Sequence, residues 1–191
     1  MKTLAFALAL VPASVVADPA RYELDPAHTT VAFLVDHVGY AATLGLFAQV
    51  EGGFTYDTDT QALSDVIVTV TADSIETLND ARDEHVRSGD FLDVGSHPQI
   101  VFTATNGAPT DATTGTVDGA LTLLGNTRPL SLDVTLNKAD AYPFGHKRFT
   151  LGLTVRGTLN RSDWGMDYGV ANGLVGDEVT LIIETEAMRM E

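Results

Sequence analysis

Apolar and polar residues alternate with a period of two along most of the chain after residue 18, a pattern typical of half-buried β-strands. Segments rich in glycine, asparagine or proline separate these stretches and are typical of turns; they include Gly52-Gly53, Tyr56–Asp59, Asn106-Gly107 and a tight hairpin at 125–129. About eight strands joined mostly as neighbours predict an all-β protein whose antiparallel sheet closes into a barrel. The alternation is clearest in 29–37, 65–72, 100–105, 116–124, 130–136, 149–155 and 179–183.

One charged stretch, residues 74–96, lacks this alternation. Asn79 is a suitable N-cap for a short helix over Asp80–Arg87, and Ser88-Gly89-Asp90 would end it. Phe91 and Leu92 then begin an apolar cluster. We expect this segment to be a helical excursion that covers one end of the barrel.

The first residues follow the pattern of a secretory signal peptide. Lys2 provides a positive charge, residues 4–11 are apolar, Pro12 breaks the run, and small residues precede Asp18. Residues 1–17 are therefore expected to be removed, leaving 18–191 as one domain in the periplasm. A buried N-terminal helix is the alternative interpretation of the same residues.

Composition narrows the possible functions. The 191-residue chain has a formal net charge of -15 and no cysteine, which excludes disulfides, thiolate metal sites and a cysteine nucleophile. The negative charge argues against nucleic acid as a partner, since phosphates would be repelled, and against adsorption to anionic membranes. A 45% hydrophobic content is enough for a substantial core.

No familiar catalytic or metal-binding motif is present. The chain contains no G-x-S-x-G, H-E-x-x-H, phosphate-binding loop or dinucleotide-binding glycine pattern. We therefore expect no catalytic residue and no metal site, and we interpret His28, His85 and His97 as capping or hydrogen-bonding groups. The stretch Asn160–Met166 is interpreted as a structural corner between strands, in which Arg161 can pair with Asp163.

An ordered set of short segments resembles the YceI-like family of secreted, lipocalin-like lipid-binding proteins. It includes Tyr22-Glu-Leu-Asp-Pro-Ala-His28-Thr, Arg82-Asp-Glu-His-Val-Arg-Ser-Gly-Asp-Phe91 and Asn160-Arg-Ser-Asp-Trp-Gly-Met166. Further matching segments are 31–39, 45–54, 73–77, 97–102, 117–125 and 175–179. The chain departs from the family pattern at Trp164, where phenylalanine is commoner, and in the wide loop Asn106–Thr113.

The resemblance implies an elongated, eight-stranded antiparallel, lipocalin-like barrel with a helical element near one mouth. It implies a soluble periplasmic protein that holds or carries a long-chain isoprenoid, a quinone-like molecule or a fatty amphiphile, without catalytic chemistry or another cofactor. Family members usually form homodimers, so we expect a homodimer, no nucleic-acid partner and no stable membrane insertion.

Alternation then predicts which side chains face the ligand tunnel, although the same residues would form the core of a filled barrel. His37, which shares a face with Phe33 and Val35, and Arg161 are the candidates for the ligand's polar end. The expected lining is Val31, Phe33, Val35, His37, Phe47, Val68, Val70, Phe91, Leu121, Leu123, Leu132, Val134, Leu151, Leu153, Arg161, Trp164 and Met166.

Other classes of protein remain open at this point. An outer-membrane barrel would share the signal peptide and the strands, but aromatic residues make up only 7% of the chain and form no clear girdles. An envelope stress protein, a quinone-linked electron-transfer accessory protein or a metal-dependent envelope enzyme would also fit. A solid, fully packed barrel interior would contradict the carrier interpretation.

Overall fold

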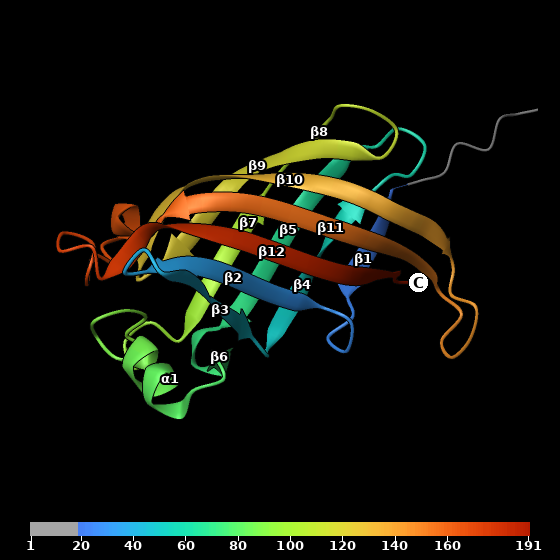
Figure 1. The fold of residues 1–191 in the computed structure, drawn as a ribbon. Helices are drawn as coiled ribbons and strands as arrows, with labels where there is room; N and C mark the ends of the chain where they lie inside the picture. The colour runs from blue at the N-terminus through green and yellow to red at the C-terminus, as the bar shows by residue number, and fades with distance from the viewer. Residues whose placement is uncertain (1–18) are drawn as a thin grey trace, which may run out of the picture.

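The computed structural model describes residues 19–191, so the predicted signal peptide lies outside the described residues. Most of this range forms β-strands (Figure 1). The strands are β1 Ala20–Leu24, β2 Thr30–His37, β3 Ala41–Phe47, β4 Val50–Tyr56, β5 Leu63–Thr71, β6 Ile75–Glu76, β7 Gln99–Ala104, β8 Ala108–Pro109, β9 Thr114–Leu123, β10 Asn126–Ala141, β11 Phe149–Asn160 and β12 Val175–Arg189. The helices are α1 Asp80–Arg87 and the 3₁₀ turns η1 Ala72–Ser74 and η2 Arg161–Trp164.

A closed antiparallel barrel is formed by β1-β4-β5-β7-β9-β10-β11-β12, because β12 returns to pair with β1. The C-terminal part of β12 pairs with β1, and its N-terminal part pairs with β2, from Glu184 opposite Thr30 to Val175 opposite His37. β1 and β2 therefore occupy one strand position, and β3 and β4 occupy the next in the same way. The prediction of an eight-stranded antiparallel barrel is confirmed.

One predicted turn was wrong, and the bounds of another differ. Gly52-Gly53 lies inside β4, where a Cβ on Gly52 would come within 2.2 Å of the Ile67 carbonyl oxygen of β5. These glycines permit close approach of two strands rather than a reversal. The predicted tight hairpin between two strands is confirmed, but its turn lies at Leu124-Gly125, both at positive φ, and residues 126–129 already belong to β10.

The predicted helix is confirmed with its cap. The side chain of Asn79 accepts a 3.0 Å hydrogen bond from the backbone N–H of Arg82, which satisfies a free donor at the helix N-terminus. The Arg87 guanidinium donates to the carbonyl oxygens of Asp73 and Ile75 and so fastens α1 to the segment around β6. The helix thus covers one end of the barrel, at the lower left of Figure 1.

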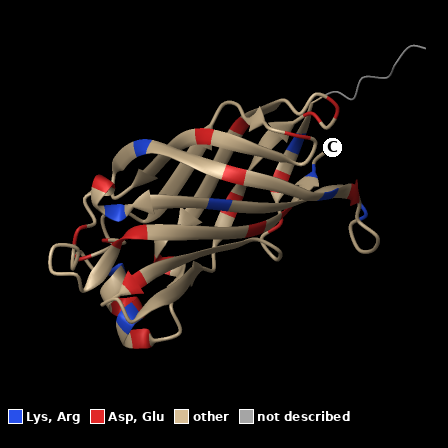
Figure 2. Cartoon of the chain, turned by 45° about the horizontal axis from the view of Figure 1, so that its top comes forward, with Lys and Arg blue, Asp and Glu red and all other residues tan. Residues whose placement is uncertain are grey.

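Charged residues are distributed along the strands and the loops, with Lys and Arg scattered among the more numerous acidic residues (Figure 2). The barrel interior is apolar, and several inward side chains such as Phe33, Val155 and Leu181 are only partly buried. Close packing would bury them completely, so their residual exposure indicates a hollow interior. Within residues 19–191, no helix is long and apolar enough to cross a membrane.

Candidate functional site

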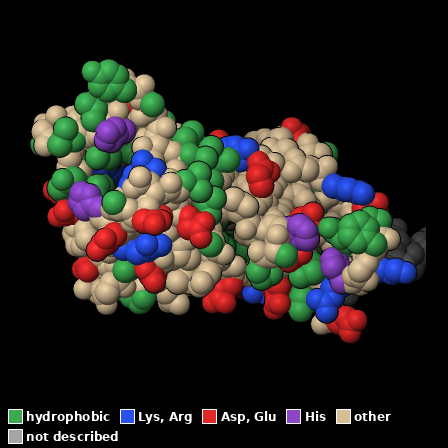
Figure 3. Space-filling model, turned by 60° about the horizontal axis from the view of Figure 1, so that its bottom comes forward, with side chains coloured by type: hydrophobic (Ala, Val, Ile, Leu, Met, Phe, Trp, Pro, Cys, Tyr) green, Lys and Arg blue, Asp and Glu red, His purple; other side chains and the backbone are tan. Residues whose placement is uncertain are grey.

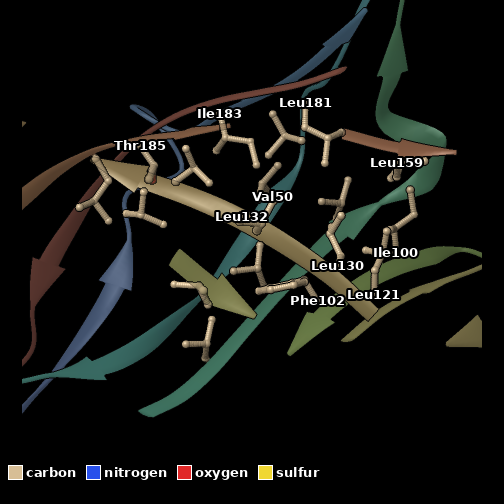
Figure 4. A pocket seen from close by; sticks show the side chains of 18 of the residues that line it. Val50, Ile100, Phe102, Leu121, Leu130, Leu132, Leu159, Leu181, Ile183 and Thr185 are labelled. Carbon is tan, nitrogen blue, oxygen red and sulfur yellow. The ribbon is translucent and has the colours of Figure 1, made fainter. Parts of the chain in front are cut away.

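An apolar cavity of about 370 Å³ occupies the barrel interior. Side chains from several strands point into it, as Leu132 of β10 and Leu181 and Ile183 of β12 do in Figure 4. This volume lies within the range of known small-molecule sites, about 300–1,000 Å³. The barrel interior is therefore hollow and apolar, and it suits a hydrophobic ligand.

The cavity is long. On β11 alone its lining runs from Leu151 to Leu159, and eight residues of strand span roughly 26 Å at ~3.3 Å per residue. At one end it reaches Val86 and Phe91 beside α1, and at the other it reaches Ala108 and Pro109 of β8. A site of this shape accommodates an extended chain better than a compact ring system.

Most residues predicted to face the tunnel do line this cavity, because period-two alternation holds along the barrel strands. They are Val31, Phe33, Val35, Phe47, Val68, Val70, Phe91, Leu121, Leu123, Leu132, Val134, Leu151, Leu153, Arg161 and Met166.

Two predicted lining residues lie elsewhere. His37 is the last residue of β2 and is exposed, because the cavity ends before the strand does. Trp164 is buried behind the wall, where its indole N–H donates a 3.0 Å hydrogen bond to the carbonyl oxygen of Leu121. Trp164 belongs to the 3₁₀ turn η2, to which strand alternation does not apply.

Arg161 is the one charged side chain among the residues that line the cavity. It is 2% exposed and donates hydrogen bonds to the carbonyl oxygens of Gly176, Met166, Tyr168 and Val175 at 2.7–3.0 Å. The expected pairing with Asp163 is wrong, since within residues 19–191 Arg161 forms no ion pair. It instead holds the segment between η2 and β12.

The guanidinium charge of Arg161 is held in a weakly solvated place. Burial lowers the pKa of Arg161, while the charges of Asp177 and Asp167 act in the opposite direction. Its guanidinium carbon lies 5.7 Å from the centre of the Phe91 ring, a cation–π geometry. Phe91 also packs at 5.1 Å against Tyr168. A hydrogen-bond acceptor at this end of the cavity would meet a positive charge without a carboxylate partner.

Sequence reasoning missed much of the lining. Some of these residues continue alternation already recognised, such as Val66 on β5, Leu130 and Leu136 on β10, and Val155 on β11. Others come from strands that were not predicted, such as Phe54 on β4, and from loops. A loop residue such as Gln61 carries no periodic signal, so only the folded chain reveals its position.

The fold and the cavity together define a class: a closed eight-stranded antiparallel barrel with a hollow apolar interior, the architecture that in other proteins encloses one small hydrophobic ligand. The YceI-like domain family matches residues 22–187. The chain belongs to the YceI-like family.

Relatives and solved structures support this assignment. The chain is 33% identical over 178 residues to a UPF0312 protein of Pectobacterium carotovorum, covering 93% of this chain and 90% of the relative. It is also 33% identical over 178 residues to Protein YceI of Escherichia coli, covering 93% and 91%.

Two solved structures share the fold at lower identity. BcnA of Burkholderia cenocepacia matches with a TM-score of 0.76 and 20% identity over 86% of this chain and 99% of that one. A polyisoprenoid-binding domain from Saccharophagus degradans matches with a TM-score of 0.62 and 15% identity over 91% and 100%.

Proposed function

We propose that this protein is a binding protein that holds or carries one long-chain isoprenoid or a similar amphiphile inside the barrel. The observation that carries this proposal is the long apolar cavity, which extends between the two ends of a closed wall. Membership of the YceI-like family and the shared fold of a polyisoprenoid-binding domain support the same ligand class.

The energetics favour a long chain over a short one. Each buried methylene contributes about 0.8 kcal/mol, whereas association costs about 4–15 kcal/mol in lost freedom of motion. A chain of about ten methylenes contributes roughly 8 kcal/mol, which only begins to offset that cost. A longer chain provides the surplus needed for tight binding with few polar contacts.

The ligand's polar end is proposed to face Arg161. Of the two candidates from the sequence, His37 lies outside the cavity lining, and Arg161 remains. Four of the five guanidinium N–H groups are occupied by carbonyl oxygens. One donor is left, which suits an acceptor such as a carbonyl, hydroxyl or phosphate oxygen.

Two further expectations belong to this proposal. The signal-peptide pattern of residues 1–17 supports a periplasmic location, which release by osmotic shock would test.

A homodimer is supported by an apolar outer row in which Leu34 pairs with Leu44, a residue that is 49% exposed. Light scattering of Leu44→Glu against the unaltered protein would test the dimer.

The main experiment extracts purified protein with organic solvent and identifies co-purified lipid by mass spectrometry. Phe33→Asp places a charge in the cavity, where an unpaired carboxylate is strongly disfavoured, and is expected to remove the lipid. Ser131→Asp, on the outer face of β10, is the matched control and should retain it.

A folding defect must be separated from a loss of binding. Phe33→Trp introduces a larger, uncharged side chain that fills part of the cavity. It should reduce the lipid bound per chain while circular dichroism stays unchanged. Full lipid occupancy in folded Phe33→Asp would contradict the proposed lining. Absence of lipid from the unaltered protein, together with failure to take up an added isoprenoid, would contradict the function itself.

A further inference from the structure

A cluster of metal-ligand side chains lies on the outer side of the barrel, where the turn after β1 meets β12. The backbone N–H of Asp25 donates to the carbonyl oxygen of Glu186 at 2.8 Å, and the N–H of Glu186 donates to the carbonyl oxygen of His28 at 3.3 Å. The Asp25 carboxylate also accepts the N–H of Ala27 at 2.9 Å. These bonds fix the backbone positions from which the three side chains extend.

The three donor atoms converge. His28 Nδ1, Asp25 Oδ2 and Glu186 Oε2 all lie within 4.8 Å of one another, with Nδ1 2.7 Å from Oδ2 and 3.7 Å from Oε2. Zinc binds imidazole nitrogen and carboxylate oxygen at about 2.0–2.2 Å, which places tetrahedral ligands roughly 3.4 Å apart. Small side-chain rotations would bring the set to that geometry.

Glu186 supplies a second, independent observation. Its Oε2 atom is buried from solvent and accepts no hydrogen bond from any residue in 19–191. A buried polar oxygen that accepts no hydrogen bond is destabilising. His28 Nδ1 forms its hydrogen bond with Asp25 Oδ2 at 2.7 Å. It lies 3.7 Å from Glu186 Oε2, which is too far for a hydrogen bond. A cation among the three atoms would satisfy the unpaired oxygen.

Other groups face the same cluster from the β10–β11 loop. The pKa of Asp25 is lowered chiefly by its hydrogen bond with His28, and the charge of His146 adds to this effect. Burial raises the pKa of Tyr142, and the negative charge of Glu186 and a hydrogen bond with the Glu186 side chain raise it further. Both loop residues are thus close to the carboxylates. Figure 3 shows two histidine side chains near each other at the right-hand end of the molecule.

We propose that Asp25, His28 and Glu186 bind one divalent transition-metal ion of the zinc type, with water completing its coordination. One nitrogen and two carboxylate oxygens suit zinc better than magnesium or calcium, which prefer oxygen ligands alone. The wall between this site and the cavity is formed by Thr29 and Thr185, whose hydroxyl groups share a 2.7 Å hydrogen bond. The proposal is therefore separate from lipid binding and does not depend on it.

The histidine–carboxylate pair of α1 provides a matched control. His85 Nε2 lies 2.9 Å from Asp90 Oδ2, and both side chains are about as exposed as His28. Among the described residues, no third metal-ligand side chain lies close enough to His85 and Asp90 to form a group of three. It should therefore contribute nothing to metal affinity.

The test titrates Zn²⁺ into untagged, EDTA-treated protein by calorimetry in the presence of a competing chelator. We expect one ion per chain, a loss of at least about ten-fold in affinity for Glu186→Gln, and a change below about two-fold for Asp90→Asn. Mg²⁺ should produce no comparable signal. Thermal unfolding of each variant checks that it is folded.

Nuclear magnetic resonance of the unaltered protein gives a second measurement that requires no variant at the site. Zn²⁺ should shift the imidazole Nδ1 resonance of His28 at one equivalent and leave that of His85 in place. Equal zinc affinity in the unaltered protein and Glu186→Gln, an unmoved His28 resonance, or an equal loss in Asp90→Asn would overturn the proposal.

Discussion

The two ends of the cavity are closed in different ways. At the α1 end, the buried Arg161 donates four hydrogen bonds to backbone carbonyls, and Phe91 packs against Tyr168. At the β8 end, the β4–β5 and β8–β9 loops are joined by a 3.0 Å hydrogen bond from the Gln61 amide to the Asp111 carbonyl oxygen. One end is fixed by a buried cation, and the other by exposed loops.

This difference gives the cavity one polar and one neutral end. A charged donor reaches the lining only at the α1 end, whereas the β8 end offers small and neutral groups such as Ala112 and Thr113. Breaking each end in turn should therefore produce unequal effects on stability.

The largest effect is expected from Arg161→Met, which keeps an unbranched apolar stem and removes the guanidinium with every donor. It leaves several carbonyl oxygens without their partner, and each unsatisfied buried group costs about 1–3 kcal/mol, so we expect a loss of about 3 kcal/mol or more. Urea unfolding followed by circular dichroism measures the change. A loss below about 1 kcal/mol would contradict a structural role for these hydrogen bonds.

A smaller effect is expected from Gln61→Ala at the opposite end. The substitution removes the exposed, neutral bond to Asp111 and a side-chain hydrogen bond with Tyr56, so the free energy of unfolding should fall by about 1 kcal/mol. Thr58→Ala, at an exposed position in the same β4–β5 loop, is the control. If Gln61→Ala destabilised the protein as much as Arg161→Met, the contrast between the ends would be wrong.

The smallest effect concerns acid pH at the β8 end. The backbone N–H of Thr113, then the hydroxyl and N–H of Thr114, lower the pKa of Asp111 to about 2. A carboxyl whose folded pKa lies below its unfolded value stabilises the fold above the unfolded value. That contribution is lost as the pH falls from about 4 toward 2.

Melting temperatures from pH 6 to pH 2 test this effect. Asp111→Ala should be less stable than the unaltered protein at pH 6, and the gap should close near pH 2. Asp118→Ala, an exposed position on β9, is the control. A gap that stays constant with pH would show that the Asp111 carboxylate contributes through something other than its charge.

Local patterns predicted the strands and the helix that depend on the alternation or capping of neighbouring residues. Alternation identified the long barrel strands and most of the lining, and Asn79 marked the start of α1. Alternation missed β1, β3 and β4; β4 was missed because Gly52-Gly53 resembles a turn when read without the neighbouring strand. It also placed Trp164 in the cavity, since nothing in its neighbours reveals a 3₁₀ turn.

The amino-acid sequence by itself determined the strand periodicity, the capped helix and the apolar character of one face of each strand, because these depend on contacts between near neighbours. Only the tertiary structure decided that β12 closes on β1, that the interior stays hollow, and that Arg161 faces carbonyl oxygens rather than Asp163. It also brought Glu186 against Asp25 and His28 from the opposite end of the chain. Such distant approaches depend on barrel closure, which no local spacing encodes.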